Sequence, residues 1–228
     1  MLLTPGLFPR KRIITAAAPS GIAFIGSVEA AGGQASPQTT AAMDTTGANL
    51  LVCAVSAFAG VAEPTVTDSK GNSWTPKTGF GSNSGRVRLH FSVPTSVGAG
   101  HTFEASNASD MYGTIIAMAF SGANSSPFDN ENGDGNDVGV SSTQPGSLTP
   151  SQNNSLIIAA CSPADQGAFP YGVDSSFIEA NEVEGVLNTI EGLIAAYLIQ
   201  GSAAAVNPTF SWTNNVNPGA AIAAFKPA

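Results

Sequence analysis

Residues 45–58 read TTGANLLVCAVSAF, and residues 149–162 read TPSQNNSLIIAACS. Each stretch opens with a polar turn that contains Asn and continues into an unbroken apolar run. When the two stretches are aligned, Leu50 falls on Leu156. Short apolar runs bounded by Asn, Ser and Gly are typical of buried β-strands. The pair therefore predicts two copies of one buried strand.

Two further matches extend this pairing along the chain. The same spacing places Phe91 on Tyr197, and a spacing one residue shorter places Phe120 on Phe225. Three matches in the same order and at a nearly constant spacing predict an internal repeat with a period of about 105 residues.

The remaining segments also favour strands. Residues 86–93, RVRLHFSV, alternate between polar and apolar side chains, which predicts a half-exposed antiparallel strand. Residues 65–76 predict a hairpin that turns at Lys70-Gly71-Asn72. Residues 183–198 have helical spacing of their apolar side chains, but the repeat assigns 193–200 to a strand. We expect a strand there and a loop or short helix over 179–191.

The repeat predicts the domain organisation. A sheet with one apolar face must be covered, and two such sheets can cover each other. We therefore expect an all-β fold, a duplicated antiparallel β-sandwich of jelly-roll type that occupies residues 31–228. Its repeats span about 45–123 and 149–228, a polar connection at 124–148 joins them, and an extended N-terminal arm, 1–30, precedes them. The alternative is two separate domains.

The composition excludes several classes of partner. The chain has 228 residues, a formal net charge of −8 and 11% charged residues, against about 25% in an average soluble protein. An acidic chain lacks the basic footprint of a nucleic-acid binder. No apolar run reaches the roughly 18 residues of a membrane-spanning helix. We expect neither nucleic acid nor membrane as a partner, and no export by a signal peptide, because Pro19 and Gly21 interrupt the apolar segment after the first basic residues.

No motif predicts catalysis, a cofactor or a metal site. Gly81–Gly85 has the glycines of a nucleophile elbow but Asn83 at the nucleophile position. His90 and His101 have no ligand-type neighbours at metal spacing and are expected on the surface. Cys53 and Cys161 lie in apolar runs and are expected to be buried free thiols. The sequence therefore predicts a protein that is not an enzyme.

Three weaker patterns could indicate functional sites, but each also has a simple structural interpretation. Residues 130–135 have the rhythm of a calcium loop, but Ser141 stands where the bidentate Glu is expected, so a flexible polar turn is preferred. The acidic residues of 179–191 are interpreted as a solvated face rather than as a catalytic pair. Among the aromatic residues, Trp74 and Trp212 are expected in the core. Tyr112 and Tyr171 are expected on the surface, where they could stack on a glycan.

The N-terminal segment combines apolar and basic residues and is predicted to contact a partner subunit. Pro5 and Pro9 favour an extended backbone, which cannot bury its own side chains. We expect the apolar anchors to dock on a neighbouring subunit and the basic groups to meet carboxylates there. The alternative is a tail folded over its own sandwich. The predicted contact residues are Leu2, Leu3, Leu7, Phe8, Arg10, Lys11 and Arg12.

Several turn and strand motifs carry a resemblance. They read GNSWTP, VGAGHTFEAS, AFSGANSSPFD, QPGSLTPSQNNSLIIA, NPTFSW and AAIAAFKPA. With these motifs, residues 45–228 resemble a group of β-rich bacteriophage and prophage virion proteins. The resemblance transfers no catalytic residue, because its motifs are turns and core strands.

The resemblance implies a place in the virion, with other capsid or tail subunits as partners and many copies or a homo-oligomer per particle. Capsid decoration or cement is the first candidate role, and a tail or baseplate accessory is the second. The alternative from a different class is a glycan-binding adhesion module that contacts the host surface.

Overall fold

The computed structural model describes residues 21–31, 33–34, 36–60, 62–107, 112–165 and 170–228. Every regular element in these ranges is a β-strand, which confirms the all-β prediction. The described ranges contain no helix that is long and apolar enough to cross a membrane.

Eight strands precede Gly122 and eight follow it. The first eight are β1 (Ala23–Ala31), β2 (Gln38–Thr39), β3 (Leu50–Phe58), β4 (Thr65–Asp68), β5 (Thr75–Gly81), β6 (Gly85–Ser92), β7 (Phe103–Ser106) and β8 (Thr114–Ser121). The second eight are β9 (Ala123–Gly135), β10 (Val140–Thr143), β11 (Ser155–Ser162), β12 (Gly172–Val173), β13 (Ile178–Val183), β14 (Leu193–Gln200), β15 (Phe210–Val216) and β16 (Gly219–Pro227).

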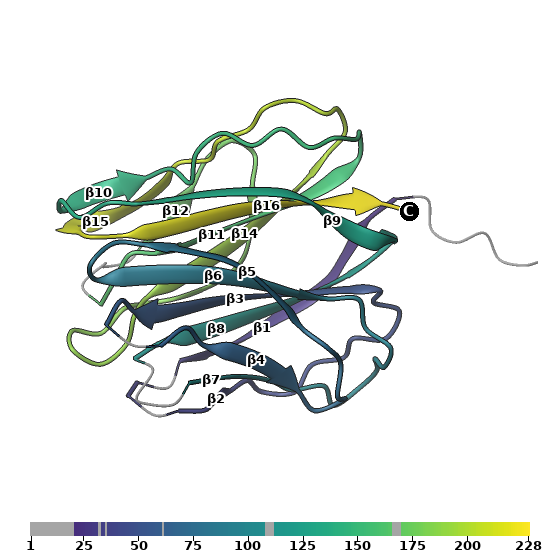
Figure 1. Cartoon of the computed structure of the whole chain (residues 1–228), viewed down its shortest axis with the longest axis horizontal. Helices are drawn as coiled ribbons and strands as arrows, with labels where there is room; N and C mark the ends of the chain where they lie inside the picture. The colour runs from purple at the N-terminus through teal and green to yellow at the C-terminus, as the bar shows by residue number, and fades with distance from the viewer. Residues whose placement is uncertain (1–20, 32, 35, 61, 108–111, 166–169) are drawn as a thin grey trace, which may run out of the picture.

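The strands form four antiparallel sheets. The first half of the chain supplies a large sheet of order β1-β8-β3-β6-β5 and a small sheet of order β2-β7-β4. The second half supplies a large sheet of order β13-β14-β11-β16-β9 and a small sheet of order β10-β15-β12. The four sheets lie one above another, with the two large sheets in the middle and the small sheets outside (Figure 1). The molecule is thus a four-layer stack.

A central core holds the two large sheets together. Its fully buried members include Leu50 and Phe120 from the first half and Leu156 and Phe225 from the second. Tyr197 reaches across to Phe120, with 5.6 Å between their ring centroids. Because each buried aliphatic or aromatic side chain stabilises the fold by roughly 1.5–3 kcal/mol, this core joins the halves into one folded unit.

Each half also has an outer core, which lies between its large sheet and its small sheet. In the first half, Cys53 and Ile115 of the large sheet pack with Phe103 of β7. In the second half, Ile222 of the large sheet packs with Trp212 of β15. Each large sheet is therefore buried on both faces, which explains why β3, β8, β11 and β16 are continuous apolar runs rather than alternating ones.

Two sequence predictions about the first half are wrong. Strand β6 is not half-exposed, because Leu89 on one face and His90 on the other are both buried. The segment 65–76 is not a hairpin either. It does turn at Gly71, whose φ is 74°, but β4 pairs with β7 of the small sheet and β5 pairs with β6 of the large sheet. The turn carries the chain from one layer to the next.

The two halves have the same strand order. Read from its β9 edge, the second large sheet runs β9-β16-β11-β14-β13, which matches β1-β8-β3-β6-β5 strand for strand. The small sheets match in the same way, β10-β15-β12 against β2-β7-β4. The aligned apolar stretches of the sequence fall on β3 and β11, which are the middle strands of the two large sheets.

Several predicted boundaries move. Residues 23–30, assigned to the arm, belong to β1, which pairs with β8 along its whole length. The polar connection at 124–148 contains most of β9 and all of β10. Residues 178–183 form strand β13 rather than a loop or short helix, whereas the strand expected at 193–200 is confirmed as β14. These polar segments form strands because they pair at sheet edges, where one face stays in water.

Glycines allow the two large sheets to approach each other closely at one end of their strands. A Cβ atom on Gly135 would lie 2.0 Å from the carbonyl oxygen of Gly81, so only glycine fits there. Hydrogen bonds cross the same place: the Ser82 hydroxyl donates to the Asn217 carbonyl oxygen at 2.6 Å, and the Asn83 amide donates to Asp137 at 2.7 Å. The relative position of the halves is thus set by polar contacts as well as by the core.

Candidate functional site

The predicted partner-contact residues lie outside the described part of the chain. These are Leu2, Leu3, Leu7, Phe8, Arg10, Lys11 and Arg12. Of the other singled-out residues, Cys53 and Cys161 are buried free thiols, as predicted. Burial raises the pKa of both thiols well above the ordinary value, which keeps them protonated and unreactive.

The prediction of two surface histidines is wrong. His90 is 2% exposed and His101 is fully buried. Burial, together with the nearby charge of Arg88, lowers the pKa of His90 to about 4. Burial also lowers the pKa of His101, although Asp68 acts in the opposite direction. Both rings are therefore neutral at physiological pH.

His101 belongs to a buried polar cluster with the residue types of a hydrolytic triad. The Thr45 hydroxyl lies 2.9 Å from Nδ1 of His101, and Nε2 lies 3.3 Å from a carboxylate oxygen of Asp68. Burial alone would raise the pKa of Asp68, but hydrogen bonds from Trp74, Asn72 and the Lys70 amide hold it below the ordinary value. Asp68 is thus an ionised carboxylate.

This cluster cannot act on a substrate. Thr45 and His101 have no exposed surface, so no substrate could reach the hydroxyl. The same groups instead hold loops together: the Gly98 amide donates to the Thr45 hydroxyl at 3.0 Å, and Trp74 donates to Asp68 at 2.8 Å. The cluster is a structural network of the first small sheet.

A pocket of about 340 Å³ opens between the two halves, a volume within the range of small-ligand sites. It lies where β3 ends, where the chain enters β8 and where it enters β14. The first half and the second half both contribute to its lining. The lining residues are Gln34, Phe58, Tyr112, Asp165, Asn188, Thr189, Ile190 and Glu191.

Glu191 is held in this pocket by the opposite half of the molecule. Its amide donates to the Tyr112 carbonyl oxygen at 2.6 Å. Its carbonyl oxygen accepts hydrogen bonds from the hydroxyls of Ser56 and Thr114, both at 2.9 Å. A residue of the second half is therefore positioned by β3 and β8 of the first, and the pocket exists only when the halves are stacked.

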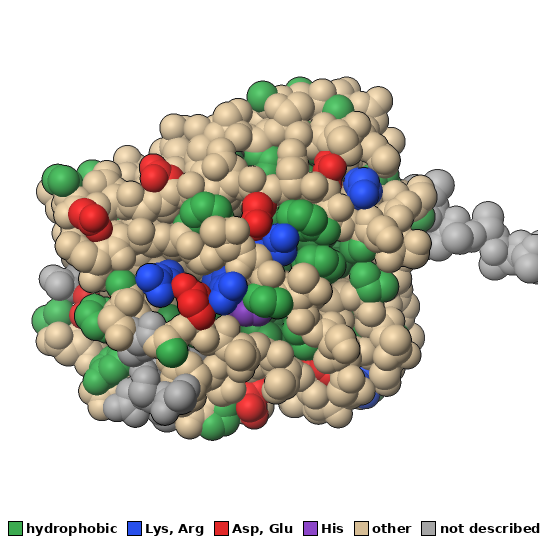
Figure 2. Space-filling view, viewed as in Figure 1, with side chains coloured by type: hydrophobic (Ala, Val, Ile, Leu, Met, Phe, Trp, Pro, Cys, Tyr) green, Lys and Arg blue, Asp and Glu red, His purple; other side chains and the backbone are tan. Residues whose placement is uncertain are grey.

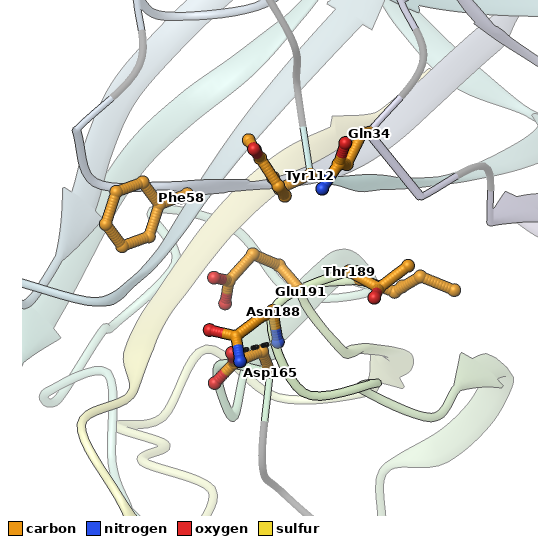
Figure 3. A pocket seen from close by; sticks show the side chains of 8 residues that line it. Gln34, Phe58, Tyr112, Asp165, Asn188, Thr189 and Glu191 are labelled. Atoms are coloured by element: carbon orange, nitrogen blue, oxygen red, sulfur yellow. Dashed lines mark hydrogen bonds between the residues drawn. The ribbon is translucent and has the colours of Figure 1, made fainter.

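The Glu191 carboxyl is buried without a partner. The residue is 3% exposed, and its Oε2 has no hydrogen-bond partner. Burial, and then the charge of Asp165, raises the pKa of Glu191 to about 8. In Figure 3 the side chain projects into the space between the Phe58 and Tyr112 rings on one side and Asn188 and Asp165 on the other. The pocket thus contains an unsatisfied acid.

A tight turn places the second carboxylate. The Ile190 amide donates to the Val186 carbonyl oxygen at 2.8 Å, and Asn188 within this turn has a positive φ of 56°. The Asn188 amide donates to Oδ2 of Asp165 at 2.7 Å, drawn as the dashed line in Figure 3. Asp165 also lines a second, smaller cavity of about 150 Å³.

The pocket contains one of the two aromatic rings expected on the surface. Tyr112 lines it and makes an edge contact with Phe58, with 6.4 Å between ring centroids. Phe58 itself is 40% exposed. Tyr171, the other expected surface ring, is buried in an outer core. Trp212 is buried in that same core and Trp74 packs against the other outer core, as predicted.

The acidic segments differ in their surroundings. Within 179–191, Glu179 and Glu184 are exposed, as expected of a solvated face, but Glu191 is not. Residues 130–135 belong to strand β9 rather than to a polar turn. In the described ranges, no group of three or more His, Cys, Asp or Glu side chains is arranged to hold a metal ion.

The chain was compared with models of known families, with curated proteins and with solved structures, and none of the three comparisons gives a match. The geometry of the pocket and the arrangement of the sheets therefore carry the functional argument.

Sequence reasoning missed this pocket because its parts are far apart in the chain. Gln34, Phe58 and Tyr112 share no motif with Asp165 or Glu191. One local signal was present. Glu191 stands between Ile190 and the apolar run that begins at Leu193, so it directly precedes a predicted strand whose first residues are all apolar. An acidic residue at the start of a buried strand is a candidate for a perturbed carboxyl group.

Proposed function

We propose that this chain is a non-enzymatic structural protein of a phage particle, present in many copies and in contact with other virion proteins. Capsid decoration or cement is the preferred role, and a tail or baseplate accessory is the second. The observation that carries the proposal is the strand order, which is the same in the two halves.

That strand order resembles a duplicated jelly roll, with one departure: β5 and β13 pair at the edges of the large sheets, whereas the fifth strand of a jelly roll lies beside the fourth in the other sheet. In an eight-stranded jelly roll, the first, eighth, third and sixth strands form one sheet, and the second, seventh and fourth strands lie in the other. The first half has this arrangement in β1-β8-β3-β6 and β2-β7-β4, and the second half repeats it. Jelly rolls recur in viral capsid proteins and in lectins. The order therefore supports duplication and a virion role.

The surface supports a role in assembly. In the view of Figure 2, charged side chains are few and several of them gather near the middle of the face, while most of the remaining surface is made of backbone and uncharged side chains. The whole chain has 8 Lys and Arg and 16 Asp and Glu among its 228 residues. Because the centres of protein interfaces are depleted in charged residues, such a surface suits contact with neighbouring subunits.

A glycan-binding adhesion module is the second candidate. The pocket favours it, because the rings of Phe58 and Tyr112 and the side-chain amides of Gln34 and Asn188 all line it. Sugars commonly bind by stacking on a ring while side-chain amides pair with their hydroxyls. Binding of a glycan to the isolated protein, lost in a Phe58→Ala variant, would favour adhesion over assembly.

Labelling of intact particles tests the proposed function. Gold-conjugated antibodies raised against the purified chain should bind around the heads of particles if the protein decorates the capsid. Labelling confined to the tail would select the accessory role. Particles that remain unlabelled, although the infected cells contain the protein, would refute a virion role.

A further inference from the structure

We propose that the pocket between the two halves binds a basic side chain, a guanidinium or an ammonium group, which is supplied by the Arg10-Lys11-Arg12 segment of a second copy of this chain. The inference deepens the assembly role proposed above, because it names a contact through which copies would join.

The pocket has acidic groups without basic ones. Asp165 and Glu191 both line it, and none of its described lining residues is Lys or Arg. The Oε2 atom of Glu191 is buried and unpaired. A buried acid without a partner is costly, and a cation with N–H donors offsets that cost through both charge and hydrogen bonds. A basic side chain is therefore the ligand that best completes this site.

The other lining groups also suit a guanidinium. The Phe58 and Tyr112 rings line the same pocket, across it from Asp165, and a cation over an aromatic face is attracted by the electrons of the ring. The side-chain amide oxygen of Asn188 can accept a further N–H. A planar guanidinium has five such donors, more than an ammonium group. Arginine should thus bind more tightly than lysine.

The rest of this chain leaves few basic groups for such a contact. Of 8 Lys and Arg residues, three stand together at 10–12. Three of the others already pair with carboxylates: Lys77 with Glu131, and both Arg86 and Arg88 with Glu63. The 10–12 segment is therefore the densest concentration of positive charge that the chain can offer.

The surroundings of the pocket match the apolar part of the arm. Phe58 lines the pocket and is 40% exposed, while Val186 and Leu187, in the same turn as Asn188, are 47% and 57% exposed. In the sequence, Leu7 and Phe8 precede Arg10 by two or three residues. An extended segment could place these apolar side chains against the turn while a basic side chain enters the pocket.

The position of β1 favours a second copy over the arm of the same molecule. β1 begins at Ala23, paired with Ser121, and ends at Ala31, paired with Thr114. The pocket lies at the Thr114 end, whereas residue 21 lies against Gly122 at the other. An arm bound in its own pocket would have to run back along β1, about 30 Å. The ten residues from Arg12 to Ile22 span at most roughly 36 Å when fully extended, so this route would require the arm to turn back and run extended along the sheet edge, which a contact with a neighbouring copy does not require.

A contact of this kind would join copies head to tail. Residue 21 lies at one end of the molecule and the pocket at the other, so each copy could give its arm to one neighbour and receive the arm of another. Heterologous contacts of this type form rings or open chains.

A peptide-binding experiment tests the inference. The peptide comprises residues 1–14 with a fluorescent label, and a matched peptide has serine in place of Arg10, Lys11 and Arg12. The receptor is the full chain with these same three residues changed to serine, so that its own arm cannot compete. Fluorescence anisotropy should show that the native peptide binds at least tenfold more tightly than the serine peptide. Equal binding of the two peptides would overturn the proposal.

Variants of the receptor locate the binding site. Glu191→Gln and Asp165→Asn should each weaken binding of the native peptide at least tenfold, while Glu179→Gln, which changes an exposed carboxylate on β13, should not change it. Thermal melts identify a variant that fails to fold, and the comparison of the two peptides needs no receptor variant. Binding that survives both pocket substitutions would overturn the site. Displacement of the peptide by neutral monosaccharides but not by arginine methyl ester would show a sugar site instead.

Sedimentation velocity tests the source of the basic group. The full chain should self-associate with rising concentration, and the serine variant of residues 10–12 should not. A full chain that stays monomeric while its pocket binds the peptide would overturn the assignment to a second copy. None of these measurements needs virus particles, so their failure and the absence of the protein from particles are separate outcomes.

Discussion

Replacing Glu191 by Gln should make the protein more stable at neutral and alkaline pH. The buried carboxyl of Glu191 has a pKa of about 8 in the folded protein, against 4.5 for an ordinary glutamate. Because a difference of one pH unit corresponds to 1.36 kcal/mol, ionisation of this group should lower the free energy of unfolding by up to about 4–5 kcal/mol. Glutamine has nearly the same shape and cannot ionise, so the variant avoids this loss.

The sign of the effect follows from proton binding. Below about pH 4.5 the carboxyl is protonated in both the folded and the unfolded chain, so it contributes no pH dependence. As the pH rises from 4.5 to about 8, the unfolded chain releases the proton and the folded chain retains it, so the folded protein loses stability. Above about pH 8 both forms are ionised, and the loss is complete.

Urea denaturation across this pH range, at protein concentrations too low for self-association, measures the effect. The difference in unfolding free energy between Glu191→Gln and the native chain should be near zero at about pH 4.5 and should grow to several kcal/mol by about pH 9. Glu179→Gln removes a carboxylate that is exposed on β13 and should show no such growth. A difference that stays constant with pH would mean that Glu191 is not buried as described, and the reasoning about the pocket would be wrong.

Three other predictions concern the fold. Phe120→Ala removes a fully buried ring of the central core and should lower the unfolding free energy by about 3–5 kcal/mol; a loss below about 1 kcal/mol in urea denaturation would show that the halves are not held by this core. Gly135→Ala places a Cβ atom 2.0 Å from the Gly81 carbonyl oxygen and should cost about 1–3 kcal/mol; a melting temperature equal to that of the native chain would exclude the close approach. His90 should make the protein less stable as the pH falls from 6.5 to about 4, because its pKa is depressed on folding. The dependence should amount to roughly 3 kcal/mol and should be missing from a His90→Gln variant, and an unchanged acid profile would contradict it.

Much of the fold could be predicted because the central strands have a recognisable sequence pattern. β3 and β11 are apolar on both faces, so their sequences are unbroken apolar runs with polar turns before them. The predicted repeat aligned the sequences of β3 and β11, and it assigned residues 193–200 to a strand, which is β14, against a helical pattern. Such patterns arise from burial on both faces, which favours an apolar side chain at every position of the strand.

The pairing between strands could be predicted less well from the sequence. The turn after β4 is local, since Asp68 accepts hydrogen bonds from the amides of Lys70 and Asn72, and the sequence predicts it correctly. Which strands the flanking segments join is decided by residues far along the chain. β5 joins the large sheet through β6, while β4 joins the small sheet through β7.

The number of layers could not be predicted from the alternating pattern. In β6, the face opposite Leu89 carries Arg88, His90 and Ser92, and it reads as solvent-facing. In the structure His90 and Ser92 are buried on this face. The sequence of β6 gives no sign that a further layer lies over it.

The pocket was the least predictable feature. Its acidic groups, Asp165 and Glu191, come from the second half, and Gln34, Phe58 and Tyr112 come from the first. The stacking of the two halves alone brings them together, through the hydrogen bonds that Ser56 and Thr114 donate to the Glu191 carbonyl oxygen. No pattern within either half of the sequence specifies that contact.

The number of copies of this chain in purified particles tests the proposed function most directly. Quantitative mass spectrometry, with labelled peptides of the chain and of the major capsid protein as standards, gives this number. A decoration or cement protein should be present in hundreds of copies per particle, and a tail or baseplate accessory in fewer. An absence of the chain from purified particles would contradict the proposal that it is part of the virion.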